Sequence, residues 1–159
     1  MLIQGYEVDV ITETLECIID YYNAVIRKDG PDAGYFTIRD SISGQPLQPI
    51  PIGVCPDDRV EKCFRLSLEK GERLFINKTH VSSFQSRDIA NKKYGGAITF
   101  PNLIISFSGL PELVDEAVML VLAYKLGWMD WAGVQNIITI SQNPFFEKFA
   151  EIYQSPNRN

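Results

Sequence analysis

The chain has 159 residues, which fits one domain, and a net charge of −5. An acidic chain repels phosphate backbones, so we expect no nucleic-acid partner. The sequence contains no window of about 18 uninterrupted apolar residues, so we expect no membrane span and a cytoplasmic protein. Three dispersed cysteines without C-x-x-C spacing argue against a disulfide scaffold or a zinc site.

The first element in the chain is an expected amphipathic helix. Apolar residues recur at steps of three and four, which marks one helix face, and Gly30-Pro31 ends the pattern. The residues of this face are Val8, Ile11, Leu15, Ile18, Ile19, Tyr22, Val25 and Ile26. A β-prone run at 35–39 follows, and then an aliphatic segment at 46–55 that contains three prolines. Because proline cannot donate to a strand ladder, we expect a hairpin whose second strand lies at a sheet edge.

The middle of the chain predicts a second helix and a second hairpin. Asp57 and Asp58 are candidate caps of a helix that extends past Gly71 toward Phe75. Residues 77–94 form a polar connection with a short helix at 85–93. Strands are expected at 97–100 and 103–107, joined by a tight turn.

The last third predicts helices. A third helix runs from Pro111 to Gly127, the stretch from Trp128 to Ile140 is ambiguous, and Ser141 is expected to cap a final helix. Antiparallel strands packed against helices predict an α+β domain over residues 1–159, with residues 128–159 as a helical extension.

The third helix is apolar on more than one face, with Leu113, Val118, Leu120 and Leu122 pointing in different directions. A helix that is hydrophobic all round is buried on all sides. We expect a homo-oligomer in which a second subunit covers this helix. The aromatic tail of the same chain is the alternative cover.

Three short pieces, taken in order, resemble the GlcG/HbpS-like family, which includes the C-terminal domain of PduO proteins. They are Arg59-Val60-Glu61-Lys62-Cys63 leading through Ser67 and Gly71, then Tyr94-Gly95-Gly96-Ala97-Ile98, then Ile105-Ser106-Phe107-Ser108-Gly109 followed by Asp115-Glu116. The resemblance implies a profilin-like antiparallel sheet flanked by helices, oligomers, and a small-molecule ligand: haem, a related tetrapyrrole or another anionic metabolite. The chain departs from the family pattern after Trp128 and lacks the proline-containing segment that usually follows the paired glycines.

The candidate site is the loop from Asn77 to Gly96. It combines the one histidine with cationic side chains in an acidic chain, so an anion would be attracted there. Paired glycines expose backbone N–H groups beside it. The expected ligand-binding residues are Lys78, His80, Arg87, Lys93, Tyr94, Gly95 and Gly96, with Lys92 nearby and Ser106 or Ser108 below.

Each of these residues also has an ordinary structural interpretation. His80 is either a haem ligand or a polar loop residue, and the glycines either approach a ligand or form a bulge. Asp115 and Glu116 are expected to favour the N-terminal turn of their helix. No nucleotide-binding loop, nucleophile elbow or metal-binding pair is present, so the sequence does not show an enzyme. Whether the protein catalyses a reaction stays open. We therefore expect a small-molecule binding domain, and the alternative is a non-catalytic oligomerising or partner-binding protein.

Overall fold

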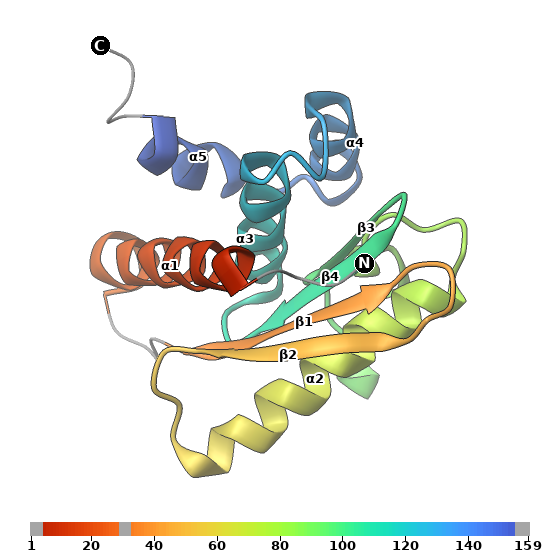
Figure 1. Ribbon diagram of the computed structural model, residues 1–159, viewed down its shortest axis with the longest axis horizontal. Coiled ribbons are helices and arrows are strands. Elements are labelled where there is room, and N and C mark those ends of the chain that lie inside the picture. Colours follow the sequence, from red (N-terminus) through yellow and green to blue (C-terminus); the bar gives the residue numbers. More distant parts are fainter. Residues whose placement is uncertain (1–4, 29–32, 155–159) are drawn as a thin grey trace.

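A four-stranded antiparallel sheet in the order β2-β1-β4-β3 lies at the centre of the structure (Figure 1), a computed structural model that describes residues 5–28 and 33–154. Its strands are β1 (Gly34–Asp40), β2 (Pro46–Ile52), β3 (Ala97–Phe100) and β4 (Leu103–Ser108). Both predicted hairpins are present, and the proline-containing β2 lies at an edge. The α+β class is therefore confirmed.

The helices form layers on both sides of this sheet (Figure 1). Helix α2 (Asp57–Ile76) covers one face, and α1 (Gly5–Tyr21) and α3 (Glu112–Lys125) cover the other. Helices α4 (Trp131–Ser141) and α5 (Phe146–Gln154) pack on α3, beyond the sheet. The connection after α2 contains two 3₁₀ turns, η2 (Ser83–Ser86) and η3 (Ile89–Asn91).

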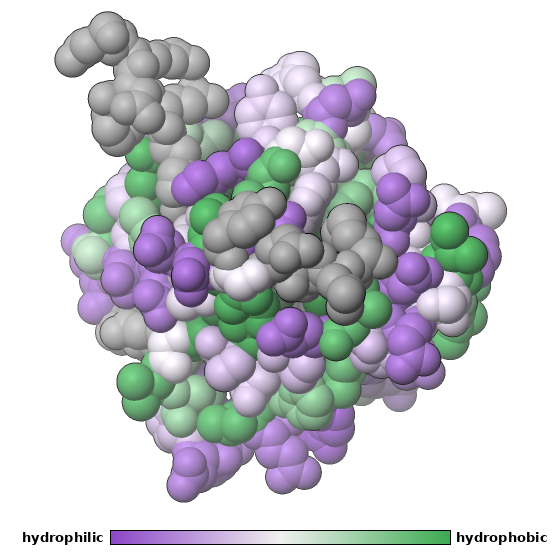
Figure 2. Space-filling view, in the orientation of Figure 1, coloured by the Kyte–Doolittle hydropathy of each residue, from purple (hydrophilic) through white to green (hydrophobic). Residues whose placement is uncertain are grey.

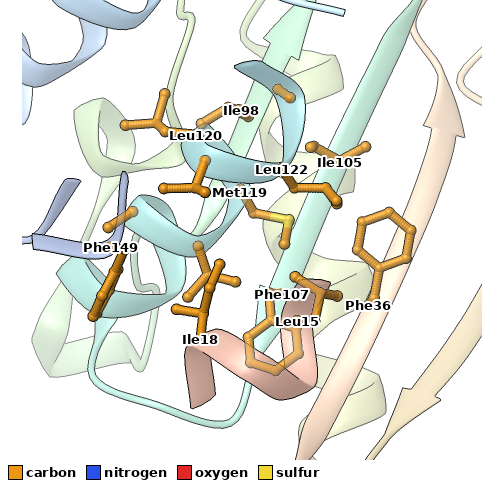
Figure 3. Close-up of a cluster of buried hydrophobic side chains, with 14 of the residues drawn as sticks. Leu15, Ile18, Phe36, Ile98, Ile105, Phe107, Met119, Leu120, Leu122 and Phe149 are labelled. Carbon is orange, nitrogen blue, oxygen red and sulfur yellow. The ribbon is translucent and has the colours of Figure 1, made fainter. Parts of the chain in front are cut away.

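The principal core surrounds α3 and is almost wholly apolar. Figure 3 shows side chains from α1, β1, β3, β4, α3 and α5 gathered there. Every residue from Val114 to Ala123 is buried, so α3 presents no exposed face over these three turns. The cover comes from α1, α4 and α5 of the same chain. The all-round apolar pattern that suggested a second subunit is thus accounted for within one chain.

The opposite sheet face, under α2, has a small apolar cluster and many polar contacts. Leu74, Ala97 and Ile104 form the apolar part. Beside it, the Thr37 and Ser67 hydroxyl oxygens lie 2.9 Å apart, and Ser67 Oγ donates to the Ser106 carbonyl at 3.3 Å. This face therefore holds its helix through named hydrogen bonds as well as through packing.

A buried carboxylate, Glu116, joins α3 to the tail. It accepts hydrogen bonds from Ser82 Oγ and Ser141 Oγ, both at 2.5 Å, and from Asn143 Nδ2 at 3.0 Å. Burial raises the pKa of Glu116, while these three donors act to lower it. The expectation that Glu116 serves the N-terminal turn of its helix is wrong, because its side chain turns inward to these donors.

Several predicted boundaries are also corrected. The first helix continues as a π-helix, η1 (Tyr22–Arg27), whose i→i+5 bonding shifts the helical phase, and Val25 is consequently 52% exposed. Asp57 and Asp58 lie in the first turn of α2 without capping it. Ser141 is the last residue of α4 and does not cap the final helix, because its hydroxyl donates to Glu116 and to the Ile137 carbonyl. Gly30-Pro31 lies outside the described residues.

Within the described ranges, no helix is both long enough and apolar enough to cross a membrane.

Candidate functional site

A cavity of about 440 Å³ lies between the first half of α2 and the start of α3. We call it the basic cleft. Five cationic side chains line it, and for four of them no ion pair is recorded within residues 5–28 and 33–154. These four are Arg59, Lys62, Arg65 and Lys92. Arg59 is held in place by donating from Nη2 to the Gly109 carbonyl at 3.3 Å.

Helix α2 supplies three of these cations at a regular spacing. Arg59, Lys62 and Arg65 are three residues apart, which places neighbouring members on one stretch of the helix surface. Lys62 and Arg65 are exposed, and Figure 2 shows hydrophilic residues along the lower edge of the view, where α2 begins in Figure 1. Lys92 reaches the same cavity from the connection before β3.

A buried ion pair lies at the inner wall of the basic cleft. Lys70 Nζ donates to Asp115 Oδ2 at 2.8 Å and to the Phe107 carbonyl at 2.9 Å, and both side chains are at most 2% exposed. Asp115 Oδ1 also accepts from the Leu110 N–H at 3.0 Å. Burial raises the pKa of Asp115 to about 7, against the lowering effect of Lys70 and of these hydrogen bonds.

The ion pair explains the second of the paired glycines, Gly96. Gly96 has φ +125°, and a Cβ there would lie 2.8 Å from Lys70 Nζ and 2.9 Å from the Asp115 Cβ. The Gly95 N–H donates to Glu112 Oε2 at 2.9 Å. Gly96 thus leaves room for the buried pair, which is the structural role that the sequence left open for the glycines beside the ligand-binding role.

Arg73 and a capping box order the connection between α2 and β3. Arg73 donates to the Ser83 carbonyl at 2.7 Å and to the Tyr94 carbonyl at 2.5 Å. Ser82 caps η2 with the reciprocal Gln85 contact that defines a capping box. The connection is therefore a folded segment, and its predicted helix at 85–93 is replaced by η2 and η3.

The structure divides the predicted site residues between different places. Tyr94 and Ser108 line the basic cleft, and Arg87 lies beside it, paired with Glu112 at 3.0 Å. Lys93 is exposed in a separate shallow cavity with Arg73.

Three further predicted residues lie away from this cleft. Lys78 and His80 line a second cavity at the other end of α2. Ser106 is buried beneath α2, and its Oγ has no hydrogen-bond partner among the described residues. The predicted residues are therefore distributed over several places and do not line one common cavity.

Sequence reasoning missed the cations on α2 and the partner of Asp115. The spacing Arg59, Lys62, Arg65 was a readable signal, because i, i+3 positions are neighbours on a helix. Lys70 gave no such signal, since a lysine in an amphipathic helix ordinarily lies at the surface. Its burial depends on Asp115, which lies 45 residues further along the chain.

No family model, no curated protein and no solved structure matches this chain.

Proposed function

We propose that this chain is a small-molecule binding domain whose basic cleft holds an anionic ligand. The observation that carries the proposal is the set of four cations without ion-pair partners around one cavity, in a chain with a net charge of −5. The two acids of the cleft wall are already engaged, Asp115 by Lys70 and Glu112 by Arg87. The local potential is therefore positive and favours a phosphate or carboxylate.

The cleft suits an anion that is small. Its volume of about 440 Å³ falls within the range of roughly 300–1,000 Å³ that is common for ligand pockets. The hydroxyl of Ser108 and the ring of Tyr94 are available beside the cations. A ligand with one or two anionic groups and a polar body would find partners on α2, on the connection and on β4.

The family resemblance implies haem as one possible ligand, and the surroundings of His80 show whether this histidine is held as an iron ligand would be. A histidine that ligates a metal ordinarily bonds its second ring nitrogen to an oxygen, which fixes the ring. His80 Nδ1 is buried without a partner among the described residues, so this support is missing. The surroundings of His80 therefore do not fit a haem-iron site.

The experiment compares two variants of equal net charge. Tripolyphosphate and citrate, at fixed ionic strength, are expected to raise the melting temperature of the wild type, since a ligand that binds only the native state stabilises it. Removing two cleft cations in K62A/R65A should weaken binding roughly tenfold. The control R27A/K148A removes two exposed cations elsewhere and should bind like the wild type. Equal weakening in both variants would reduce the effect to net charge and contradict the proposal.

The same samples address the family interpretation. A haem titration without a change in the Soret band would contradict the hypothesis of a tetrapyrrole ligand, and it would not affect the proposal of an anion site. Light scattering would test the homo-oligomer, which stays a prediction here. A particle of 18.0 kDa at high concentration would contradict it.

A further inference from the structure

The largest described cavity, about 710 Å³, lies at the opposite end of α2 from the basic cleft and shares no lining residue with it. Three aromatic rings contribute to its wall: Phe75 near the end of α2, Phe100 at the end of β3, and Trp128 after α3. Phe100 and Trp128 stack, with ring centroids 5.8 Å apart and an interplanar angle of 28°. We call this cavity the aromatic pocket.

Flat rings favour a flat guest. Aromatic side chains bind other aromatic groups in offset-stacked or edge-on arrangements, beyond the effect of the apolar area that is covered. Leu74 and Ile104 supply further apolar surface at the pocket. An aromatic ligand would therefore remove both its own surface and these walls from water.

Two charged side chains of opposite sign line the pocket, Lys78 and Asp130. Lys78 is exposed, its Nζ lies 3.3 Å from the centroid of the Phe75 ring, and no ion-pair partner is recorded for it within the described ranges. The acid of the same pocket, Asp130, accepts the Gly133 N–H at 2.8 Å as the cap of α4. The carboxylate thus accepts a bond from the start of α4, while the ammonium lies over the Phe75 ring and can also contact an anion.

His80 adds a polar group with an unmet bond. Its backbone N–H donates to the Asn77 carbonyl at 2.9 Å, which fixes the residue at the pocket, but its Nδ1 is buried without a partner among the described residues. An unpaired buried polar atom destabilises a structure, because no bond offsets the loss of its hydration. A ligand oxygen that bonds to this nitrogen would offset that cost.

We propose that the aromatic pocket binds a flat aromatic molecule that carries one anionic group, with the rings against Phe75, Phe100 and Trp128 and the anion at Lys78. This site is separate from the basic cleft, where the ligand is polar and no aromatic wall of this kind exists. The proposal therefore does not depend on the function proposed above.

The test uses two fluorescent probes of nearly equal shape. The anionic probe is 1-anilinonaphthalene-8-sulfonate, and the neutral one is N-phenyl-1-naphthylamine. The chain has two tryptophans, and Trp131 does not line the pocket, so W131F leaves Trp128 as the reporter. In this background both probes should quench Trp128 saturably by energy transfer.

Lys78 then separates the two probes. K78A should weaken the anionic probe by about three- to tenfold, the range of a partly exposed ion pair, and leave the neutral probe unchanged. K78R should restore binding of the anionic probe, and R27A, at an exposed cation that lines neither cavity, should change the binding of neither probe. Near-ultraviolet circular dichroism of each variant confirms that the probe meets a native fold.

Three results would overturn the proposal. The first is the absence of saturable Trp128 quenching by either probe. The second is an equal response of both probes to K78A. The third is tighter binding of a cationic dye such as acridine orange, because it would mean that Asp130 and the ring faces, not Lys78, set the charge preference.

Discussion

The two faces of the sheet are both covered by helices, but they are built from different chemistry. The face under α1 and α3 presents Phe36, Ile38, Ile105 and Phe107 to a large apolar core. The face under α2 presents Thr37 and Ser106. The buried polar side chains of the helix on this side are Ser67, Lys70 and Arg73.

The difference indicates that one face mainly stabilises the fold, while the other positions the helix beside which the candidate ligand sites lie. Apolar burial is roughly proportional to area and does not depend on direction, so the α3 face supplies the main driving force for folding. Hydrogen bonds and the buried ion pair are directional, and they fix the position of α2 against the sheet. Both candidate ligand sites lie along α2, beside the polar face.

The largest expected effect comes from a cavity in the apolar face. Phe107 is fully buried in the core, and F107A should lower the free energy of unfolding by about 3–5 kcal/mol, because the large ring leaves a cavity that the surroundings fill only in part. Urea denaturation measures this. The control I42A, at a side chain that is 78% exposed, should stay within about 0.5 kcal/mol of the wild type.

A smaller loss is expected on the polar face when one member of its ion pair is removed. K70M leaves the Asp115 carboxyl buried without its cation and should cost about 3 kcal/mol. The double variant K70M/D115L removes both charges and should return to within about 1 kcal/mol of the wild type, since apolar residues can replace a buried pair at little cost. A double variant as unstable as K70M would mean that the ion pair stabilises the fold more than apolar side chains in the same place do.

The ion pair also predicts a dependence on pH. Asp115 has a folded pKa of about 7 against an ordinary value of 3.8, so the native state binds more protons between these values. The stabilising effect of the protonated Asp115 is complete below pH 4 and is lost as the pH rises through 7. Glu116, whose pKa is also raised, acts in the same direction.

Chemical denaturation from pH 4 to 8 checks this slope. D115N should flatten it in part and leave the contribution of Glu116. Asp40 and Asp88 have lowered pKa values and therefore affect stability mainly below pH 4, outside this window. An unchanged slope in D115N would mean that Asp115 is ionised throughout the range.

The apolar face was predictable from the sequence and the polar face was not. The spacing of Ile11, Leu15 and Ile18 follows the repeat of a helix, and the apolar runs of the second hairpin are typical of strands. These local patterns alone located α1, β3 and β4. The tail was predicted only in outline, because the β-branched residues at 137–140 suit a strand as well as a helix, and the structure has α4 there, capped by Asp130.

The candidate sites could be predicted only in part, since they depend on contacts between distant segments. Lys78 and His80 were named, but the sequence could not show that Phe100 and Trp128 lie beside them. Tyr94 and Ser108 were named, but their partners on α2 come from about 30 residues or more earlier in the chain. Local patterns carry no information on such pairings.

The smallest expected effect concerns Ser106, and its sign is opposite to that of the others. Its Oγ is buried under α2 without a hydrogen-bond partner among the described residues, so the side chain bears a desolvation cost that no bond offsets. S106A removes that hydroxyl and should raise the urea midpoint, corresponding to a gain of up to about 1 kcal/mol. The matched variant is S67A on the facing helix, whose hydroxyl contacts Thr37 and donates to the Ser106 carbonyl. It should lose about 1 kcal/mol, because Thr37 keeps its buried hydroxyl and loses a partner. Equal losses in S106A and S67A would show that Ser106 Oγ is satisfied in solution, and the polar face would then have no unpaired group at its centre.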